Sequence, residues 1–406
     1  MIKFATKLFL LFYVFTASAQ ISTCDGNRFI DSVFVEVKGP TTVKYGSNET
    51  IGGVQQDLFM DVFEPLNDVE TTRPLIILAF GGSFISGVRS DMNQIAKDYA
   101  ARGYVAATID YRIFDQLLLL DSAKLLDVVV KGVGDMKASI RYFKKDFTEN
   151  GNVFNIDTNY IFVGGASSGA ILANHVGLVG SNDKVPEYFQ SVIDANGGWE
   201  GNSSENTSYS SSVAGVISFS GAIKDIAWID ENDVPVFAAH DDKDPVVPYE
   251  RGLSVVDFGP LQFPLIYIYG GKSIVTALEA KNVYSELVTI ETAEHVSYLN
   301  GTTVDTHWGL ICRKSAAFIE KIICTTTWSV DELQVLFNVY PNPASGLLTV
   351  DTDREVDHLN IHDLMGRVVL TSSNKNTISV DGLKAGYYYL SVSAEGKLGV
   401  QSIMVK

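Results

Sequence analysis

Basic residues are scarce in this 406-residue chain, which has 31 Lys and Arg against 48 Asp and Glu and a formal net charge of −17. Nucleic-acid binding needs clustered Lys and Arg to neutralise phosphates, so the composition argues against a nucleic-acid partner. The acidic residues form no long run, which is typical of a solvated surface. The balance fits a soluble protein that works outside the cell.

Long hydrophobic runs are absent after the first twenty residues, so we expect no stable insertion of the mature protein in a membrane. The chain begins MIKFATKLFLLFYVFTASAQ. Two lysines, a short apolar run and a small-residue site in that order are typical of a cleaved secretory leader. We predict a signal peptide over residues 1–19.

Cysteine is also rare, with Cys24, Cys312 and Cys324 the three in the chain. Export makes a disulfide possible. Cys24 follows the predicted leader and Cys324 ends the last predicted helix of the first domain, so a bond between them would tie the ends of that domain together. We predict this pairing, with Cys312 as a buried thiol. Three free, buried cysteines remain the alternative, because spacing alone does not fix the pairing.

Strands and helices alternate over residues 20–325. Residues 29–65 show the two-residue alternation of antiparallel strands, and later runs such as PLIILAF and YVAATIDYR are continuously apolar, as in strands buried on both faces. Amphipathic helical stretches separate them. This order predicts an α/β fold with a mostly parallel central sheet flanked by helices, whose working site lies at the carboxyl ends of the strands.

The pattern changes towards the carboxyl end. After a linker at 326–337, residues 338–406 form short, regularly spaced strands punctuated by Gly, Asp and Asn. This spacing predicts a small all-β sandwich as a separate domain.

A serine stands between two glycines in the run NYIFVGGASSGAILANHV, where a predicted strand turns into a predicted helix. Small residues at Gly165 and Gly169 permit a strained turn that holds the Ser167 hydroxyl clear of the sheet. The amino end of the helix favours developing negative charge at that place. We therefore predict Ser167 as a nucleophile; an idle serine in a tight packing turn is the alternative.

A nucleophilic serine needs donors for the oxyanion that it creates. The run AFGGSFISG, residues 79–87, follows a predicted buried strand and is rich in glycine. The backbone N–H groups of Gly82 and Ser83, with that of Ser168, are the predicted oxyanion donors. An ordinary glycine-rich loop is the alternative for this run.

An acid and a histidine complete such a site. In AAHDDKDPVVPYE we favour Asp244, at the turn before a proline, and expect Asp241 and Asp242 to be solvated. The acid spacing lacks the Gly and the distal Glu of a calcium loop, so no metal site is predicted. His240 is interpreted as structural.

The base is predicted at His295, which directly follows the last strand of the domain. His307 is the weaker candidate because it lies near the start of the closing helix, and base and nucleophile must meet at one sheet edge. His175, on the helix after Ser167, is interpreted as buried structure. The resulting order, Ser then Asp then His, is that of the α/β-hydrolase triad.

With these residues in place, residues 24–325 resemble the α/β-hydrolase superfamily and most closely secreted carboxylesterase/lipase-like proteins of Bacteroidetes. The resemblance implies hydrolysis of carboxylic esters through an acyl-enzyme, without a cofactor. That family usually has a histidine before Gly-Gly, where this chain has Phe80. Its catalytic histidine usually follows Gly-x-Gly, where this chain has Ala293 and Glu294 before His295. The pair Tyr111-Arg112 matches the pattern of such esterases.

The carboxyl-terminal domain resembles a type IX secretion sorting domain through YPNPASGLLTV, HDLMGRVVL and LKAGYYYLSV. The resemblance implies the type IX secretion machinery as a partner, export across the outer membrane to the cell surface or medium, and removal of the domain. A carbohydrate-binding sandwich is the alternative, suggested by the tyrosines at 387–389. Neighbouring rings on a strand point to opposite faces, so at most two share one side.

The leading interpretation is a secreted serine esterase acting on a small or polymeric ester. A serine peptidase of the same fold is one alternative, although no propeller-like amino-terminal domain precedes the site. A catalytically inactive surface adhesin is the other. The polar stretch 181–211 is read either as a flap over the site or as a plain surface loop, the latter being the usual case.

Overall fold

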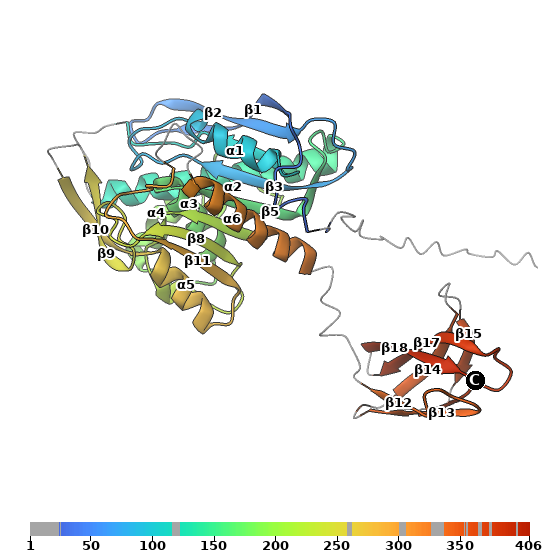
Figure 1. The fold of residues 1–406 in the computed structure, drawn as a ribbon. Helices are drawn as coiled ribbons and strands as arrows, with labels where there is room; N and C mark the ends of the chain where they lie inside the picture. Colours follow the sequence, from blue (N-terminus) through green and yellow to red (C-terminus); the bar gives the residue numbers. More distant parts are fainter. Residues whose placement is uncertain are drawn as a thin grey trace, which may run out of the picture. The chain divides into compact units, whose positions relative to one another are not determined.

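The computed structural model describes a set of ranges that covers most of the chain: 24, 26–115, 122–257, 262–299, 306–325, 337–352, 354, 356–363, 368–372, 376–394 and 397–406. The predicted signal peptide and nearly all of the predicted linker lie outside these ranges. The chain divides into two compact units, residues 1–323 and 324–406, which are described separately (Figure 1).

The first unit is built on an eight-stranded sheet of order β1-β2-β4-β3-β5-β6-β8-β11. The strand β2 pairs antiparallel with β1 and β4, and all other neighbours are parallel. The bounds are β1 Val37–Glu49, β2 Gln55–Pro65, β3 Arg73–Ala79, β4 Val105–Ile109, β5 Ile156–Ala166, β6 Gly215–Phe219, β8 Val236–Asp241 and β11 Ser285–Ile290. The predicted α/β-hydrolase fold is confirmed.

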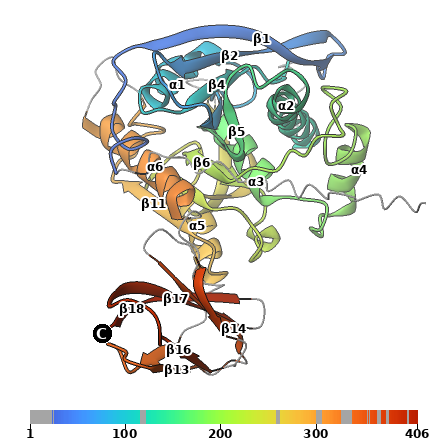
Figure 2. The same cartoon turned by 90° about the vertical axis from the view of Figure 1, so that its right-hand side faces the viewer.

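Helices cover both faces of this sheet. Figure 2 shows α1 and α6 on one side of the strands and α2, α3 and α4 on the other. Every residue of β3, β4, β6 and β8 is buried as a result, which explains their continuous apolar runs. The helices are α1 Asn93–Ala100, α2 Ser122–Glu149, α3 Ser168–Leu178, α4 Glu187–Ala195, α5 Gly271–Ala280 and α6 Thr306–Thr325.

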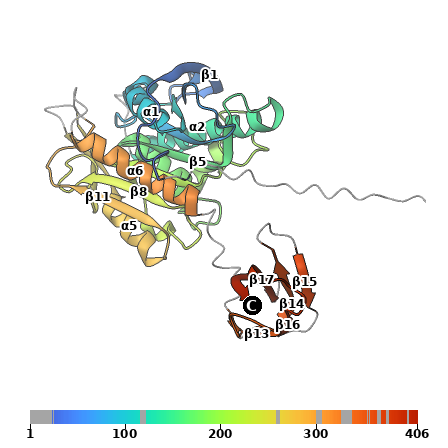
Figure 3. The same cartoon turned by 45° about the vertical axis from the view of Figure 1, so that its right-hand side comes forward.

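The closing helix α6 crosses the sheet beside α1 (Figure 3). The Tyr99 hydroxyl lies 2.6 Å from the Ser315 Oγ, and Trp308 Nε1 donates to Asp98 Oδ2 at 2.7 Å. These contacts hold the last helix on the face that α1 already covers.

The cysteines follow the predicted pairing. Cys24 and Cys324 are disulfide-bonded and Cys312 is free, so in a chain with three cysteines the bond joins the first to the last. Cys324 lies in the last turn of α6. Cys312 is 1% exposed, and this burial raises the pKa of its thiol to about 12.

Some elements were not predicted from the sequence. They are the helices α4 and α5 and a small antiparallel sheet of order β7-β10-β9. Its strands are β7 Ala222–Ile223, β9 Arg251–Asp257 and β10 Gln262–Gly270. The small sheet and α4 border the site described below, so they matter for function although they lie outside the alternating strand–helix pattern.

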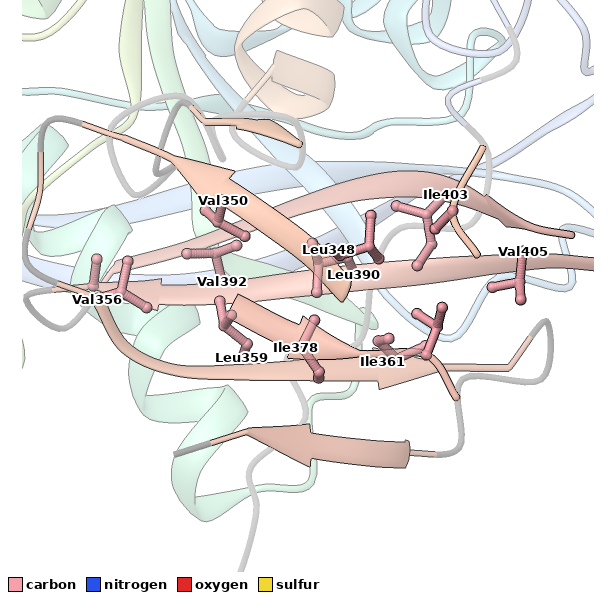
Figure 4. Packing of buried hydrophobic residues seen from close by; sticks show 13 residues of the cluster. Leu348, Val350, Val356, Leu359, Ile361, Ile378, Leu390, Val392, Ile403 and Val405 are labelled. Carbon is pink, nitrogen blue, oxygen red and sulfur yellow. The ribbon is translucent and has the colours of Figure 1, made fainter. Parts of the chain in front are cut away.

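The second unit contains two antiparallel sheets of order β12-β13-β16 and β15-β14-β17-β18. Its strands are β12 Asn338–Tyr340, β13 Leu347–Asp351, β14 Val356–His362, β15 Val368–Ser372, β16 Thr377–Ser379, β17 Gly386–Ala394 and β18 Lys397–Val405. Figure 4 shows the aliphatic core between them, with Leu348, Leu359 and Leu390 fully buried. The predicted small all-β sandwich is confirmed.

The three consecutive tyrosines on β17 alternate as expected for a strand. Tyr387 and Tyr389 are exposed, whereas Tyr388 packs against the core. At most two rings therefore share one face.

Candidate active site

The turn around Ser167 is strained. Ser167 lies between β5 and α3 with φ 53° and ψ −117°, a conformation that is uncommon for a residue with a side chain. Its N–H donates to the carbonyl of Phe219, on the neighbouring strand β6, at 2.8 Å. The surrounding structure thus fixes the serine at the carboxyl end of the sheet, where sequence reasoning placed it.

The two glycines beside this serine are required by packing. A Cβ atom added at Gly165 would lie 2.4 Å from the carbonyl oxygen of Ala79, and one added at Gly169 would lie 2.2 Å from the same oxygen. Real Cβ contacts are not this short, so the strand-to-helix turn can pass the end of β3 only with hydrogen at both positions.

Three predicted side chains lie in one hydrogen-bonded row. His295 Nε2 is 2.8 Å from Ser167 Oγ, and His295 Nδ1 is 2.6 Å from Asp244 Oδ2. The second carboxylate oxygen of Asp244 accepts the N–H groups of Val246 and Val247 at 2.8 and 3.0 Å. The structure therefore brings together residues from three loops at the carboxyl edge of the sheet.

The Asp244 carboxyl is ionised at neutral pH. Burial acts to raise its pKa, but hydrogen bonds from His240 and His295, helped by the His295 charge and the Val246 N–H, outweigh burial and lower the pKa to about 2. An acceptor held as a carboxylate selects the His295 tautomer with its proton on Nδ1. The Nε2 atom is then free to accept the Ser167 proton.

His240 is a buried support for this carboxylate. Its Nδ1 accepts the N–H of Gly271 at 3.2 Å, so the proton is on Nε2. That Nε2–H donates to the Val247 carbonyl at 3.0 Å and lies 3.5 Å from Asp244 Oδ2. The side chain holds the acid loop and does not contact Ser167, in agreement with its structural interpretation.

The prediction that Asp241 is solvated is wrong. Its side chain is fully buried and accepts hydrogen bonds from the Thr292 hydroxyl at 2.8 Å and from the Ser297 N–H at 3.2 Å, as well as from the Ser297 hydroxyl. Both partners lie on the loop that carries His295. Asp242 is half-buried, its carboxylate 3.9 Å from Lys243 Nζ.

The other two histidines have separate positions. His307 lies in the first turn of α6, and its side chain is outside the described residues. His175 is buried on α3, with Nδ1 2.7 Å from the Ile171 carbonyl and Nε2 accepting the Lys224 N–H at 3.3 Å. Burial lowers the pKa of His175 to about 4, so its ring is neutral at neutral pH.

The loop after β3 has an unusual backbone. Gly82, Ser83 and Phe84 have positive φ angles of 133°, 54° and 63° in succession. Within the described ranges, no backbone carbonyl accepts from the N–H of Gly82 or Ser83. Ser168 is the first residue of α3, where an N–H has no intrahelical acceptor. The predicted oxyanion donors are therefore available to a ligand.

Phe80, in place of the usual histidine, packs within the core. Its ring stacks on Tyr111 at a centroid distance of 4.2 Å, and the Tyr111 hydroxyl donates to the Phe80 carbonyl at 2.9 Å. The same hydroxyl lies 3.1 Å from Ser168 Oγ. This aromatic pair thus connects the glycine-rich loop to the start of α3. Glu294, the other departure, has an exposed side chain.

A cavity of about 460 Å³ opens beside Ser167. Ser83, Ser167 and Ser168 line it, and the remaining walls come from α2, α3, α4, β7, β9, β10 and the loop after Asp244. The sequence did not predict this cavity, because part of its wall belongs to α4, β7, β9 and β10, which the strand–helix pattern missed.

The polar stretch 181–211 is part of this wall and is anchored. Its helix α4 contributes Tyr188, Phe189 and Val192 to the cavity. Beyond α4, the Trp199 carbonyl accepts from Lys137 Nζ at 2.7 Å, and Ser203 Oγ accepts from Arg112 at 2.9 Å. Both cationic side chains are buried. These hydrogen bonds tie the stretch to α2 and to the segment that follows β4.

Across the ranges that the structure describes, no group of His, Cys, Asp and Glu side chains could hold a metal ion. Among the described helices, none combines the length and the hydrophobicity that crossing a bilayer requires.

Two family models match this chain. Residues 60–257 match the BD-FAE family, and residues 338–406 match the family described as secretion system C-terminal sorting domain. No curated protein matches the chain.

Similar solved structures include three forms of esterase 2 (Est2) of the Planctomycetes species Thermogutta terrifontis. The propionate-bound and native forms are each 19% identical with a TM-score of 0.50, and cover 70% of this chain and 94% and 92% of their own. The apo form is 20% identical with a TM-score of 0.50, and covers 71% of this chain and 96% of its own. At this identity the likeness shows the fold. The chain thus joins an α/β-hydrolase domain, similar to the BD-FAE family, to a type IX secretion sorting domain.

Proposed function

We propose that this protein is an exported serine hydrolase of carboxylic esters. The observation that carries the proposal is the row of hydrogen bonds from Ser167 through His295 to Asp244, set at a strained strand-to-helix turn beside unpaired backbone donors. A serine hydroxyl is a weak nucleophile unless a base takes its proton, and this row supplies the base and orients it.

In the proposed reaction, Ser167 Oγ attacks the ester carbonyl carbon while its proton passes to His295 Nε2. The negative charge that forms on the carbonyl oxygen is stabilised by the N–H groups of Gly82, Ser83 and Ser168. The carbon–oxygen bond to the alcohol then breaks, and the alcohol leaves with the proton from His295. Water then attacks the acyl carbon while its proton passes to the same imidazole, and His295 returns that proton to Ser167 Oγ as the acid leaves.

Asp244 and the oxyanion donors stabilise opposite charges in this reaction. Asp244 stays ionised and stabilises the imidazolium that forms during each transfer, without taking the proton itself. Each oxyanion donor of this kind typically contributes about 3–4 kcal/mol to the transition state. The chemistry needs no cofactor.

The comparisons support an ester as substrate, since the similar solved structures are of an esterase. The sorting domain supports export by the type IX machinery, with the mature hydrolase at the cell surface or outside the cell. We therefore assign the protein to the carboxylic ester hydrolases. We expect it to have no nucleic-acid partner.

The test is Ser167→Ala, matched with Ser191→Ala on the exposed side of α4. We expect Ser167→Ala to lower the hydrolysis of p-nitrophenyl acetate by at least about a thousandfold and to abolish labelling by a fluorophosphonate, with wild-type values for Ser191→Ala. Native hydrolysis by Ser167→Ala would refute the proposal. Failure of the wild type to be labelled would favour an inactive adhesin, and faster cleavage of peptide amides than of esters would favour a peptidase.

A further inference from the structure

The cavity beside Ser167 has strongly apolar walls. Aliphatic side chains from at least five elements line it, among them Val129 of α2, Ile171 of α3, Val192 of α4, Ile223 of β7 and Ile268 of β10. An apolar cavity next to a reacting atom binds an apolar part of the substrate. The inference below rests on the proposed function and adds to it the class of acid.

The position of His295 decides which part of the ester enters the cavity. Among the described residues, Ser83, Ser167 and Ser168 line the cavity and His295 does not. The leaving alcohol must take its proton from His295 Nε2, so it departs on the histidine side. The His295 side chain is 19% exposed, which places that side next to solvent. The acyl group, bonded to Ser167, is therefore the part that the cavity encloses.

Apart from the exposed Tyr188, the polar side chains that line the cavity away from the reacting serine are hydrogen-bonded within the protein. Both ring nitrogens of His175 are hydrogen-bonded to backbone groups. Lys224 Nζ donates to the Tyr267 carbonyl at 2.9 Å, and the Ser254 hydroxyl donates to the Ile266 carbonyl at 3.2 Å. Among the aliphatic side chains of the walls, a carboxylate or a hydroxyl on the acyl group would lose its water without gaining a partner, which is unfavourable.

We propose that the natural acyl group is an uncharged aliphatic chain of medium length. The 460 Å³ cavity corresponds to the volume of roughly fifteen water molecules at about 30 Å³ each. A chain of roughly six to ten carbon atoms fits within this space. Each methylene buried there raises kcat/KM by up to about fourfold, because transfer from water to an apolar site favours it by that factor.

The first experiment uses the full wild-type chain and p-nitrophenyl esters of acetate, butyrate, hexanoate, octanoate and dodecanoate. We expect kcat/KM to rise by roughly thirtyfold or more from acetate to octanoate, and an ester of a hydroxylated aromatic acid to fall well below octanoate. A value that is highest for acetate and falls with chain length would overturn the proposal.

The second experiment reduces the cavity with Val192→Trp. Its matched control is Ser191→Trp, the adjacent residue on α4, which is exposed. We expect the octanoate-to-acetate ratio of kcat/KM to fall at least tenfold in Val192→Trp and to keep its wild-type value in Ser191→Trp. An unchanged ratio in a folded, fluorophosphonate-labelled Val192→Trp protein would contradict the assignment of the cavity.

The two proposals fail in different ways. If Ser167 is not a nucleophile, no ester in the series is hydrolysed and no label is incorporated. If only the acyl assignment is wrong, the label is incorporated and acetate is hydrolysed, but longer chains bring no gain. The wild-type series answers the question even if the tryptophan variant does not fold.

Discussion

The carboxylate of Asp241 accepts a hydrogen bond from the hydroxyl of Thr292 at 2.8 Å, in the loop that carries His295. Asp244, on the same turn, accepts from His295 itself at 2.6 Å. The acid loop therefore has two separate contacts with the histidine loop. One carboxylate fixes the backbone of that loop, and the other fixes the ring.

We expect Asp241→Asn to lower kcat by roughly ten- to a hundredfold. The amide keeps one acceptor oxygen for the two hydroxyls, but its NH2 group replaces the oxygen that accepts the Ser297 N–H, so the backbone of the His295 loop loses that anchor. Asp242→Asn, in the same loop, is the matched control and should retain kcat. The readouts are kcat and the downfield NMR resonance of the His295 Nδ1 proton. If Asp241 positions His295, Asp241→Asn lowers kcat and also reduces the intensity of that resonance. Loss of stability with native kcat would mean that Asp241 is structural.

Gly169→Ala should prevent the native turn, since its Cβ would lie 2.2 Å from the Ala79 carbonyl oxygen. We expect a loss of unfolding free energy above about 3 kcal/mol, together with loss of fluorophosphonate labelling. The control is Gly309→Ala in α6, where an added Cβ meets open space and alanine favours the helix by up to about 1 kcal/mol. Thermal unfolding of both variants checks this. Equal midpoints would contradict the packing argument.

Tyr111→Phe keeps the ring stack on Phe80 but leaves the Phe80 carbonyl, beside the glycine-rich loop, without its hydroxyl donor. We expect a loss of about 1–3 kcal/mol of stability and a severalfold fall in kcat with little change in KM. Tyr104→Phe also removes a buried hydroxyl, which bonds the Phe29 and Ala316 carbonyls away from the site. It should cost similar stability with native kcat. A matching fall in kcat there would show that the effect is general.

Asp233 should make stability depend on pH. Burial and the nearby charges of Asp230 and Asp183 raise its pKa to about 7, against the lowering effect of the Asp230 N–H. A raised carboxyl pKa means that the folded state binds the proton more tightly, so this contribution is complete below about pH 4 and is lost as pH rises through 7.

Asp233→Asn removes that loss. We expect the variant to be more stable than the wild type by about 1 kcal/mol at pH 8, a figure reduced for solvent screening, and to match it near pH 4. Denaturant unfolding at both pH values measures this difference. If the difference in unfolding free energy between the two proteins were the same at pH 4 and pH 8, Asp233 would not titrate in that range.

Local pattern was enough to predict that Ser167, Asp244 and His295 lie together, because each follows a strand whose carboxyl end reaches one edge of the sheet. It was not enough for Asp241. Three aspartates share one short run, and which of them turns inward depends on Thr292 and Ser297, about fifty residues later in the chain. A prediction from neighbouring residues alone cannot include a contact between such distant parts of the chain.

The walls of the cavity show a second limit. The strands β9 and β10 form an antiparallel pair outside the main sheet, and their side chains face the cavity only because the small sheet packs beside α3. A reading based on strand–helix alternation passes over such a pair. The helix α5 had an amphipathic pattern that a closer reading of residues 271–280 would find.

The bond between Cys24 and Cys324 makes the backbone from the first of these residues to the second a closed covalent ring. One peptide cut inside that ring releases no fragment until the bond is reduced. One cut after Cys324 frees everything that follows it. A cut that removed the sorting domain and a nick within the hydrolase would therefore leave different products on a non-reducing gel.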